Sequence, residues 1–441
     1  MSKQFYIKTF GCKLNFSESA TLERLLSKKG YVLADKSSAA DIYIVNTCAV
    51  TETAEKKCRQ YIHQVKKQNF QAKIVLVGCY SALENAKTIA SEVDLMLGSG
   101  NKLQLIEQID TLFNNDNQTI VVKEKPHEPF FASYSIDERT RSFLKIQDGC
   151  DYFCTYCTVA YARGRSRSDS IENILQHARE IVAGNVKEIV LSGVNIGDFK
   201  TTKGEYFIDL LHALEEVEGL HRIRISSIEP NLLTHEIIDW VANSKKILPH
   251  FHIPLQSGCN EILSQMKRRY PRELFAEKVF LIKEKMPHCC IAADVIVGFP
   301  GETDAFFDDT YRFIEALPIS MLHVFPYSKR PNTVAAAMEN HLNNECKNKR
   351  ANSLIELSNS KKATFYQQNC NRACYALMEA KKENGFLTGF TDNYVRIKLP
   401  YNANIINEIV KINILETDAD GICKAELGFD FEIIELKNKP L

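Results

Sequence analysis

The sequence predicts an α/β protein in three parts: an N-terminal open parallel α/β domain, a central partial (β/α)6 barrel and a small C-terminal β-barrel. Short segments rich in Ile, Val, Tyr and Phe alternate with helix-like segments through about the first hundred residues, and the alternation resumes after a polar break. The length of 441 residues suits two or three domains. About the last seventy residues change to short alternating runs separated by glycine and proline, which is the pattern of a small barrel.

The first domain is predicted to cover residues 1–115. Its strands are expected at 5–10, 41–45 and 73–77, and its helices at 17–29 and 53–67. This order favours a parallel sheet, which places ligands at the carboxyl ends of its strands. A polar stretch with Pro126 and Pro129 interrupts the pattern, so residues 116–135 are interpreted as a linker.

The central domain is predicted over residues 136–366 and contains six βα repeats. Its strands are expected at 142–147, 188–194, 222–227, 250–255, 291–297 and 321–325. Its helices are expected at 170–183, 206–218, 232–243, 274–285 and 304–317, before a helix-rich stretch at 333–368. Parallel barrels carry their chemistry on the loops that follow the strands, so functional residues are expected there.

The C-terminal domain is predicted over residues 367–436, with breaks at Gly385 and Gly389. Its strands are expected at 373–379, 394–399, 409–415 and 422–427. From Tyr366 onward the chain has nine Lys and Arg against eleven Asp and Glu, a net charge of −2. RNA-binding modules are usually basic. If the protein binds RNA, either another part of the chain supplies the positive charge, or four basic residues of this domain share one face: Lys381, Lys382, Arg396 and Lys398.

Composition limits the possible partners and the compartment. The formal net charge is zero, so a nucleic acid would be held by local patches and not by a global field. The first residues lack the apolar run of a signal peptide, and no later stretch is apolar enough to span a membrane. We therefore expect a cytoplasmic protein without membrane contact, in which the fourteen cysteines are buried side chains, ligands or catalysts.

Three cysteines in one short loop, Cys150, Cys154 and Cys157, have the spacing C-x3-C-x2-C. They can converge on one inorganic centre, and no fourth Cys or His lies close by in the sequence. A structural zinc ion takes four protein ligands, whereas a cubic iron–sulfur cluster held by three thiolates keeps one iron open. The spacing favours the cluster, with a zinc knuckle as the competing interpretation.

Three further cysteines follow the strands predicted in the first domain. Cys12, Cys48 and Cys79 each come directly after one of these strands. Because the carboxyl ends of parallel strands meet at one edge of a sheet, these thiols are placed to share a second metal centre. The alternative is that they are buried side chains, since cysteine is common inside α/β folds.

The triple-cysteine loop, with Tyr152, Phe153 and Tyr156 between its thiols, resembles that of radical S-adenosylmethionine enzymes. In that family the open iron binds S-adenosylmethionine, and one electron releases a 5′-deoxyadenosyl radical. The resemblance implies cofactor contacts on loops after the barrel strands, at Gly193, Asn195, Glu229, Gln256 and Gly298. The competing interpretation is that Glu229 caps a helix and that the glycines only turn the chain.

The whole chain resembles the methylthiotransferases, through the motifs at 11–15, 46–51 and 78–79 together with the cysteine loop. The resemblance implies two [4Fe–4S] clusters and S-adenosylmethionine as cofactors, with Cys12, Cys48 and Cys79 as ligands of the second cluster. It implies no catalytic residues beyond the cluster ligands. The C-terminal module resembles the TRAM domain, an RNA-binding β-barrel.

The reaction that this resemblance implies has two halves. One S-adenosylmethionine methylates a sulfur at the open iron of the second cluster. Another is cleaved to the radical, which removes hydrogen from C2 of an adenine, and the methylthio group joins that carbon.

Three branches of this family differ in substrate. The sequences Gly-Cys-Lys-Leu-Asn at 11–15, Asn-Thr-Cys-Ala-Val-Thr at 46–51 and Ala-Arg-Gly-Arg-Ser-Arg-Ser at 162–168 are typical of the branch that modifies N6-threonylcarbamoyladenosine at position 37 of tRNA. The branch for isopentenyladenosine in tRNA usually has Gln-Met in place of Lys13 and Leu14, and a third branch modifies an aspartate of a ribosomal protein. A non-catalytic iron–sulfur or zinc RNA-binding protein is the alternative of another class.

The expected partners are the anticodon loop of tRNA, S-adenosylmethionine and an electron donor such as flavodoxin or ferredoxin. Arg163, Arg165 and Arg167 are predicted to contact the substrate, because guanidinium groups suit phosphate. They could instead bind carboxylates or form a solvated loop. The run 267–269 is either a second basic patch or plain surface. Aromatic residues near the active face, such as Tyr152, Tyr156 and Phe299, could stack on the base, although core packing is the expected role of most of them.

Overall fold

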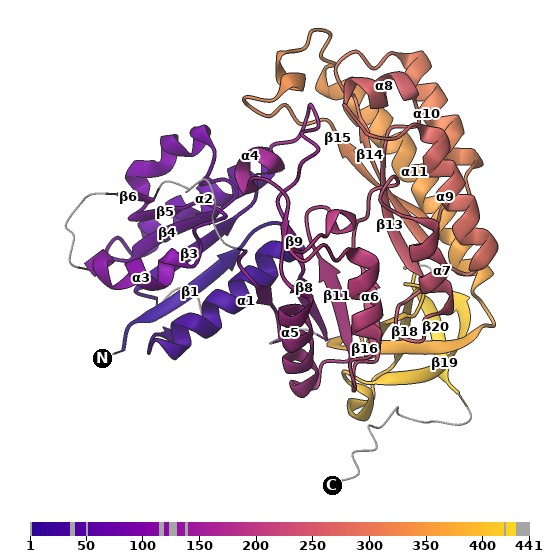
Figure 1. The fold of residues 1–441 in the computed structure, drawn as a ribbon, viewed down its shortest axis with the longest axis horizontal. Helices are drawn as coiled ribbons and strands as arrows, with labels where there is room; N and C mark the ends of the chain where they lie inside the picture. Colours follow the sequence, from indigo (N-terminus) through magenta and orange to yellow (C-terminus); the bar gives the residue numbers. More distant parts are fainter. Residues whose placement is uncertain are drawn as a thin grey trace.

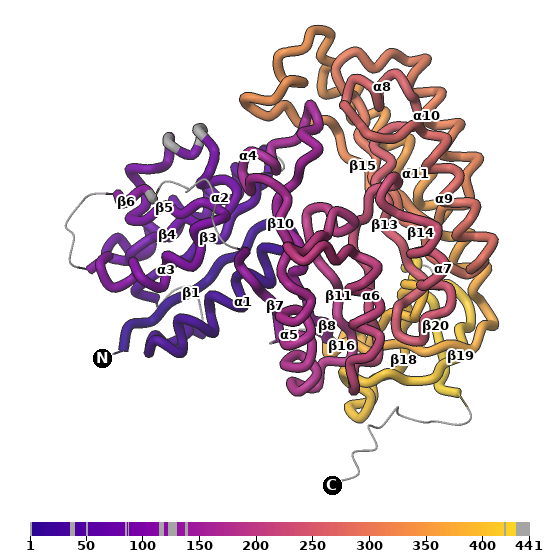
Figure 2. The backbone as a smooth tube through the Cα atoms, viewed as in Figure 1, coloured from indigo at the N-terminus to yellow at the C-terminus, as the bar shows by residue number. Residues whose placement is uncertain are grey.

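The computed structural model describes residues 2–35, 40–49, 52–113, 119–122, 130–136, 140–418 and 420–428. In Figure 1 the N-terminal domain, in indigo and purple, stands beside the central domain, and the C-terminal barrel, in yellow, packs beneath the central domain. Figure 2 shows α4 and β10, which belong to the central domain, lying on the side of that domain that faces the N-terminal domain.

The N-terminal domain is a six-stranded parallel sheet with helices on both faces. The strand order is β2 (Val32–Leu33), β1 (Gln4–Thr9), β3 (Ile42–Thr47), β4 (Lys73–Gly78), β5 (Leu95–Leu97) and β6 (Ile120–Val122). The covering helices are α1 (Lys13–Lys28), α2 (Glu52–Gln68) and α3 (Gln104–Gln108). Successive side chains of β3 point to opposite faces of the sheet, so Ile44 packs against α1 and α3 whereas Tyr43 packs against α2.

Part of the predicted linker is regular structure. Strand β6 adds to the N-terminal sheet next to β5, and β7 (Ser133–Tyr134) pairs antiparallel with the first strand of the central domain. Pro126 and Pro129 lie outside the described residues. Both strands are too short to show a period-2 pattern, which is why the sequence pattern missed them.

Six parallel strands follow one another in chain order around the central domain. They are β8 (Arg141–Lys145), β11 (Glu188–Ser192), β12 (Arg222–Ile225), β13 (His250–Gln256), β14 (Cys290–Val297) and β15 (Met321–Pro326). They pair in parallel as two groups of three, and a parallel bridge between Ser227 and His252 joins the groups. The predicted partial barrel is confirmed, with β7 at one edge and β15 at the other.

Helices surround these strands and bury a core of Ile, Leu, Val and Phe side chains. They are α5 (Ile171–Ala183), α6 (Phe207–Glu215), α7 (His235–Asn243), α8 (Asn260–Gln265), α9 (Arg272–Lys285), α10 (Asp304–Ala316) and α11 (Asn344–Gln368). Ser170, Thr234 and Thr303 start α5, α7 and α10 by accepting a backbone N–H with the side-chain oxygen.

The C-terminal residues form a closed five-stranded barrel. Its order is β16 (Ala373–Glu383), β17 (Phe386–Thr391), β18 (Arg396–Pro400), β20 (Cys423–Leu427) and β19 (Ile409–Thr417). The small β-barrel is confirmed, but β17 runs through Gly389, which the sequence pattern treated as a break. A side chain at Gly389 would meet the Leu377 carbonyl oxygen, so this glycine allows β16 and β17 to approach closely.

This barrel docks on the starting ends of the central strands. Arg222, the first residue of β12, donates to the Tyr375 carbonyl at 3.2 Å, and Arg141, the first residue of β8, pairs with Glu379 at 2.7 Å. The carboxyl ends of the same strands are left for the cysteine loops. The C-terminal barrel therefore lies at the opposite end of the central strands from the candidate site.

Candidate active site between the two α/β domains

The N-terminal cysteines follow three adjacent strands of one sheet, as predicted. Cys12 is the N-cap of α1 after β1, Cys48 follows β3 and Cys79 follows β4. Asn15 ties the first two loops together, because its side-chain amide donates to the Phe10 carbonyl at 2.7 Å and to the Thr47 carbonyl at 2.9 Å. The backbone N–H of Cys79 donates to the Thr47 carbonyl at 3.2 Å.

Two glycines allow these strand ends to converge. Gly11 (φ +110°) and Gly78 (φ +107°) precede Cys12 and Cys79 and adopt conformations that L side chains rarely reach. A Cβ at position 11 would lie 2.6 Å from Cβ of Cys48, and one at position 78 would lie 2.7 Å from the Thr47 carbonyl oxygen. Any side chain at either position would push the loops apart.

The second triad lies in the loop between β9 (Gln147–Asp148) and α4 (Val159–Arg163). Each of its sulfurs accepts an N–H: Cys150 from the Tyr152 backbone at 3.4 Å, Cys157 from the Val159 backbone at 3.4 Å, and Cys154 from the Arg268 guanidinium at 3.1 Å. Burial raises the pKa of the Cys150 thiol to about 11 and that of Cys157 to about 12. These two free thiols are thus protonated at neutral pH, and a metal would take them as thiolates.

The spacing of the sulfurs bears on whether either triad, as it stands in this structure, can hold a single zinc ion. Among the residues that the structure describes, the one group of three Cys, His, Asp or Glu side chains with all ligand atoms within 4.8 Å is His252, Asp294 and His323. Neither cysteine triad is that compact. Because a Zn–S bond is about 2.3 Å, two sulfurs on one zinc ion are at most about 4.6 Å apart. In each triad at least one pair of sulfurs is therefore too far apart in this structure to share one zinc ion.

Arg268 is a site residue that the sequence pattern did not identify. The sequence left open whether the basic run 267–269 is plain surface. In the structure the Arg268 side chain is only 3% exposed. It pairs with Glu229 and reaches both the Cys154 sulfur and, at 3.4 Å, the Tyr156 hydroxyl. Burial raises the pKa of the Glu229 carboxyl, and the Arg268 charge opposes that shift. This pair fixes the middle cysteine of the loop.

Two of the predicted cofactor contacts have side chains suited to a ligand. Asn195 is 3% exposed, and both polar atoms of its side chain lack a hydrogen-bond partner in the described structure. Gln256 has a left-handed backbone (φ +65°) at an irregularity of β13 and lines a cavity of about 240 Å³ beside Cys157. A buried amide without partners and a strained residue beside a cavity are features of a binding site.

The predicted glycines have packing roles instead. Gly193 lies against Gln147, whose side-chain oxygen accepts the backbone N–H groups of Val194 and Asn195 at 3.0 and 2.9 Å. Gly298 lies against Lys347 of α11 and donates its N–H to the Glu302 carboxylate at 2.8 Å. Gly193 thus shapes the turn that presents Asn195, whereas Gly298 faces a helix.

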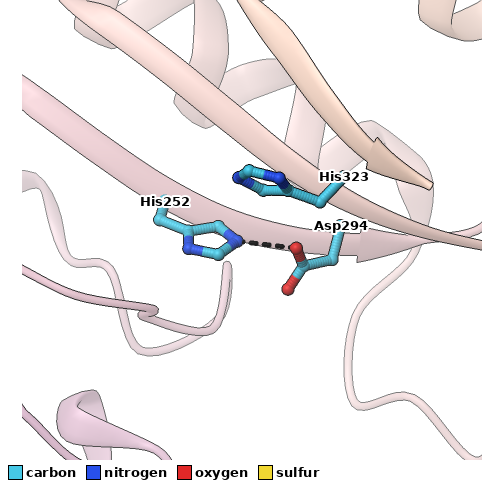
Figure 3. Close-up of side chains that lie close together, drawn as sticks. All are labelled: His252, Asp294 and His323. Atoms are coloured by element: carbon cyan, nitrogen blue, oxygen red, sulfur yellow. Dashed lines mark hydrogen bonds and ion pairs between the residues drawn. The ribbon is translucent and has the colours of Figure 1, made fainter. Parts of the chain in front are cut away.

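Polar side chains line the interior of the partial barrel below the cavity. His252 of β13 pairs with Asp294 of β14 at 2.7 Å, and its ring centroid lies 5.1 Å from that of His323 of β15 (Figure 3). Asp294 also lines the cavity beside Cys157. The cavity next to the cysteine loop is lined mostly by apolar atoms, and Asp294, Gln256 and Arg330 are among its polar residues.

The three predicted arginines separate into different environments. Arg163 is buried, and its guanidinium donates to the Cys79 sulfur, Asn15, Glu18 and Asp148. Arg167 is half-buried and pairs with Asp148 at 3.2 Å. Arg165 is 76% exposed, and its pairing with Asp151 at 3.4 Å is loose. Burial and full hydrogen bonding leave no guanidinium nitrogen of Arg163 for a phosphate, so the structure places it inside the protein, whereas Arg165 faces solvent.

The aromatic residues on the surface of the loop are also not the predicted ones. Tyr152 and Phe299 are buried. Instead, Tyr161 of α4 is exposed and makes an edge contact with Phe153 at a centroid distance of 5.9 Å. The Arg165 guanidinium lies over the Phe153 ring at 4.9 Å. These three residues form one polar and aromatic surface, which we call the α4 platform.

Most basic side chains of the C-terminal barrel are neutralised within it. Lys381 and Arg396 both pair with Glu383, at 2.6 and 3.7 Å, and Lys398 pairs with Asp418. Lys382 lies over the Tyr401 ring at 4.5 Å. The basic face considered from the sequence is therefore largely paired with carboxylates.

None of the described helices is long and apolar enough to cross a membrane.

Residues 4–98 match the family described as "Uncharacterized protein family UPF0004", and residues 144–314 match the "Radical SAM superfamily".

The chain is 39% identical to "Threonylcarbamoyladenosine tRNA methylthiotransferase MtaB" of Bacillus subtilis, over 92% of this chain and 93% of that protein. A Thermotoga maritima protein of the same name is 35% identical, over 96% and 98%. A "tRNA-2-methylthio-N(6)-dimethylallyladenosine synthase" of Carboxydothermus hydrogenoformans is 32% identical, over 94% and 97%.

Solved structures share the fold. The radical S-adenosylmethionine methyltransferase TsrM from Kitasatospora setae superposes with a TM-score of 0.57 at 13% identity, over 76% of this chain and 75% of that chain. The cobalamin-dependent S-adenosylmethionine radical enzyme OxsB superposes with a TM-score of 0.52 at 13% identity, over 76% and 55%.

Proposed function

The chain belongs to the radical S-adenosylmethionine tRNA methylthiotransferases, and we propose that it inserts a methylthio group at C2 of N6-threonylcarbamoyladenosine at position 37 of tRNA. The observation that carries the proposal is the presence of two cysteine triads, one on each of two adjoining domains, in a chain that aligns end to end with relatives of that name. The relatives named for dimethylallyladenosine are 30–33% identical, whereas those named for threonylcarbamoyladenosine are 35–39% identical.

The proposed ligands of the two [4Fe–4S] clusters are Cys12, Cys48 and Cys79 for the auxiliary cluster and Cys150, Cys154 and Cys157 for the radical cluster. When bound, the clusters and S-adenosylmethionine supply the electron, the radical and the sulfur chemistry of the reaction. The protein contributes the positions of the ligands. Asn15 joins two of the three strand ends, the Cys79 N–H donates to the Thr47 carbonyl, and each sulfur of the radical loop accepts an N–H.

For S-adenosylmethionine, the supported contacts are Asn195, Gln256 and Glu229. The Asn195 amide is buried without partners, Gln256 lines the cavity, and Glu229 lies beside Cys154 through Arg268. Buried polar atoms without hydrogen-bond partners gain the most free energy from a ligand that supplies those partners. Gly193 contributes by shaping its turn, and Gly298 has the least support because it packs on α11.

Polar side chains close to the cavity suit the threonylcarbamoyl substituent. His252, Asp294 and His323 offer donors and acceptors to a substituent that carries a carboxylate and a hydroxyl. The rest of the cavity lining is mostly apolar, so the preference for the threonylcarbamoyl substituent rests on the similarity to the relatives of that name.

The α4 platform is the proposed contact for the tRNA anticodon loop. Unpaired bases stack on exposed aromatic rings and on arginine planes, and a free guanidinium suits phosphate. Tyr161, Phe153 and Arg165 offer these features directly after the cysteine loop. Arg167 already pairs with Asp148, so it is a weaker candidate for a phosphate contact.

We also infer a cytoplasmic location, where tRNA is found, and reduction by a small electron carrier such as flavodoxin or ferredoxin. Both follow from the chemistry of the family.

Nucleoside analysis of bulk tRNA from a deletion strain tests the proposal. We expect loss of the methylthiolated threonylcarbamoyladenosine and its return when the gene is restored, with the isopentenyl species unchanged. Persistence of the threonylcarbamoyl product together with loss of the isopentenyl product would support the other tRNA branch. If neither changes and the purified protein binds RNA and zinc without cleaving S-adenosylmethionine, the protein is a binding module.

A further inference from the structure

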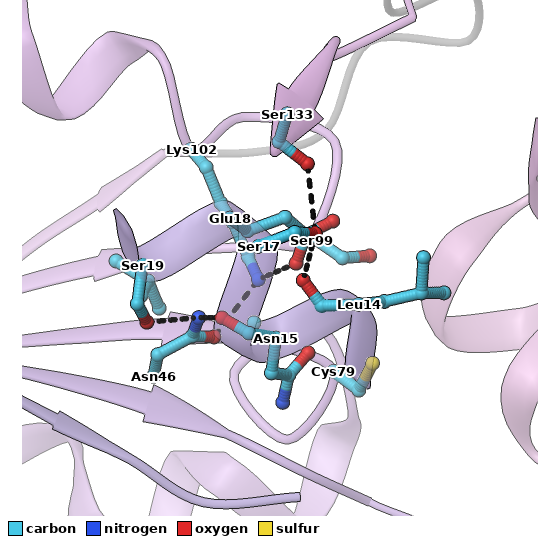
Figure 4. Close-up of polar contacts among 12 residues, drawn as sticks. Leu14, Asn15, Ser17, Glu18, Ser19, Asn46, Cys79, Ser99, Lys102 and Ser133 are labelled. Carbon is cyan, nitrogen blue, oxygen red and sulfur yellow. Dashed lines mark hydrogen bonds and ion pairs between the residues drawn. The ribbon is translucent and has the colours of Figure 1, made fainter. Parts of the chain in front are cut away.

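A buried network of charged side chains joins the two domains beside Cys79. Glu18 of α1 accepts from Lys145 of β8 at 2.7 Å and from Arg163 of α4 at 3.0 Å, and it also pairs with Lys102. Asp148 of β9 accepts from Lys145 at 2.7 Å and from Arg163 at 3.0 Å. Figure 4 shows Glu18, Lys102, Asn46 and Cys79 in this region.

The charges in this network do not balance. Lys102, Lys145 and Arg163 are three cations, whereas Glu18 and Asp148 are two carboxylates, so one positive charge is in excess among side chains at most 3% exposed. Arg167 adds a further contact to Asp148 from the rim. An uncompensated charge in a dry interior is costly unless a counter-charge lies close by. The Cys79 sulfur accepts from Nε of Arg163 at 3.2 Å, so a proposed cluster ligand lies directly against this positively charged network.

Arg163 also connects the two triads along the chain. It is the last residue of α4, which starts two residues after Cys157. Its guanidinium crosses to the N-terminal domain, where Nη2 donates to Asn15 at 2.8 Å, and Asn15 in turn holds the loops that precede Cys12 and Cys48. One side chain therefore contacts a ligand of the first triad and ends the helix that follows the second.

We infer that Arg163 is a positioning residue for the auxiliary cluster: it holds the Cys79 sulfur, raises the reduction potential of the cluster and fixes that ligand to the helix behind the radical loop. The inference rests on the ligand assignment proposed above. An N–H donated to a ligand sulfur and a nearby positive charge both favour the more negative, reduced state of an iron–sulfur centre.

The experiment uses the full chain with Cys150, Cys154 and Cys157 replaced by alanine, so that only the auxiliary site can be loaded. Iron content and the midpoint potential, followed by electron paramagnetic resonance, are measured for this background with Arg163→Met, Arg163→Lys or Lys145→Met. Lys145→Met is the matched control, because it removes a buried positive charge from the same network without touching a cysteine. Melting of the apo-proteins reports the stability of each variant.

We expect Arg163→Met to lower the equilibrium constant for reduction of the cluster about tenfold. For a one-electron couple this is a decrease of about 59 mV in the midpoint potential. Arg163→Lys should give a smaller shift because it keeps the charge, and Lys145→Met should leave the potential close to that of the background. If Arg163→Met binds no iron while Lys145→Met does, at equal apo-protein melting temperatures, the positioning role is also supported.

Equal potentials in the Arg163→Met variant and the background would overturn the inference, and so would equal shifts or equal iron loss in the Arg163→Met and Lys145→Met variants. A background that binds no iron contradicts the ligand assignment itself, whereas a loaded background with an unchanged potential contradicts only the role of Arg163.

Discussion

The two cysteine triads are built in opposite ways. The radical loop gathers Cys150, Cys154 and Cys157 within eight residues, and backbone N–H groups of the same loop reach two of the sulfurs. The auxiliary triad takes one cysteine from each of three strand ends, and glycines and Asn15 bring them together. One site is local in sequence, and the other depends on the folded sheet.

A buried arginine from outside each triad contacts one of its sulfurs. Arg268 reaches Cys154 and pairs with Glu229, whereas Arg163 reaches Cys79 and pairs with Glu18 and Asp148. Arg268 belongs to the same domain as the sulfur it contacts, but Arg163 comes from the other domain. The auxiliary site is therefore complete only when the two domains are docked, which the radical loop does not require.

The largest expected effect separates the triads by function. Serine at Cys12, Cys48 or Cys79 should reduce methylthio transfer by at least about a thousandfold and leave release of 5′-deoxyadenosine measurable, because the radical loop is untouched. Serine at Cys154 should abolish both. Cys58→Ser is the control, since Cys58 is buried in α2 and belongs to neither triad. Product chromatography measures both reactions, and loss of 5′-deoxyadenosine in the auxiliary variants would contradict this division.

A smaller effect is expected at Arg268. Arg268→Met should slow S-adenosylmethionine cleavage by about a hundredfold, the scale for loss of one oriented charged donor in a dry site. It also leaves Glu229 buried without its partner, which destabilises the fold. The double variant Arg268→Met with Glu229→Gln should recover the melting temperature of the apo-protein but cleave more slowly than Glu229→Gln alone, which is the reference because Glu229 is itself a proposed cofactor contact. Equal cleavage rates in the double variant and in Glu229→Gln would show that Arg268 acts only through stability.

The same difference between the triads decides what the sequence could predict. The spacing of its cysteines identifies the radical loop directly. Cys12, Cys48 and Cys79 are predicted as a group because each follows a strand, and parallel strands end at one edge of the sheet. Arg163 and Arg268 were not assigned correctly because an arginine in a basic run has the same local pattern whether it is buried or solvated. Its environment is set by carboxylates more than a hundred residues away in one case, Glu18, and 39 residues away in the other, Glu229.

An effect of about tenfold is expected on the α4 platform. Tyr161→Ala should weaken binding of an anticodon stem-loop to the apo-protein by about 1–3 kcal/mol if one base stacks there. Arg165→Ala should weaken binding and lower the slope of log affinity against log salt by about one. Phe70→Ala is the matched control, because Phe70 is an exposed aromatic of the N-terminal domain. Fluorescence anisotropy measures the affinities, and equal effects of Phe70→Ala and Tyr161→Ala would contradict the proposal.

The smallest effect concerns the end of the central barrel away from both triads. Glu188 is buried between Arg222 and Arg224, and their charges lower the pKa of its carboxyl to about 2. A folded-state pKa below the unfolded value of about 4.3 stabilises the protein above that value, and the stabilisation is lost as the pH falls toward 2. Glu188→Gln should lower the melting temperature of the apo-protein by several degrees at pH 7, and the difference from wild type should shrink below about pH 4. Glu277→Gln, at an exposed position on α9, should change neither value. A difference that stays constant with pH would mean that packing against the C-terminal barrel, and not the Glu188 charge, sets the stability of this end.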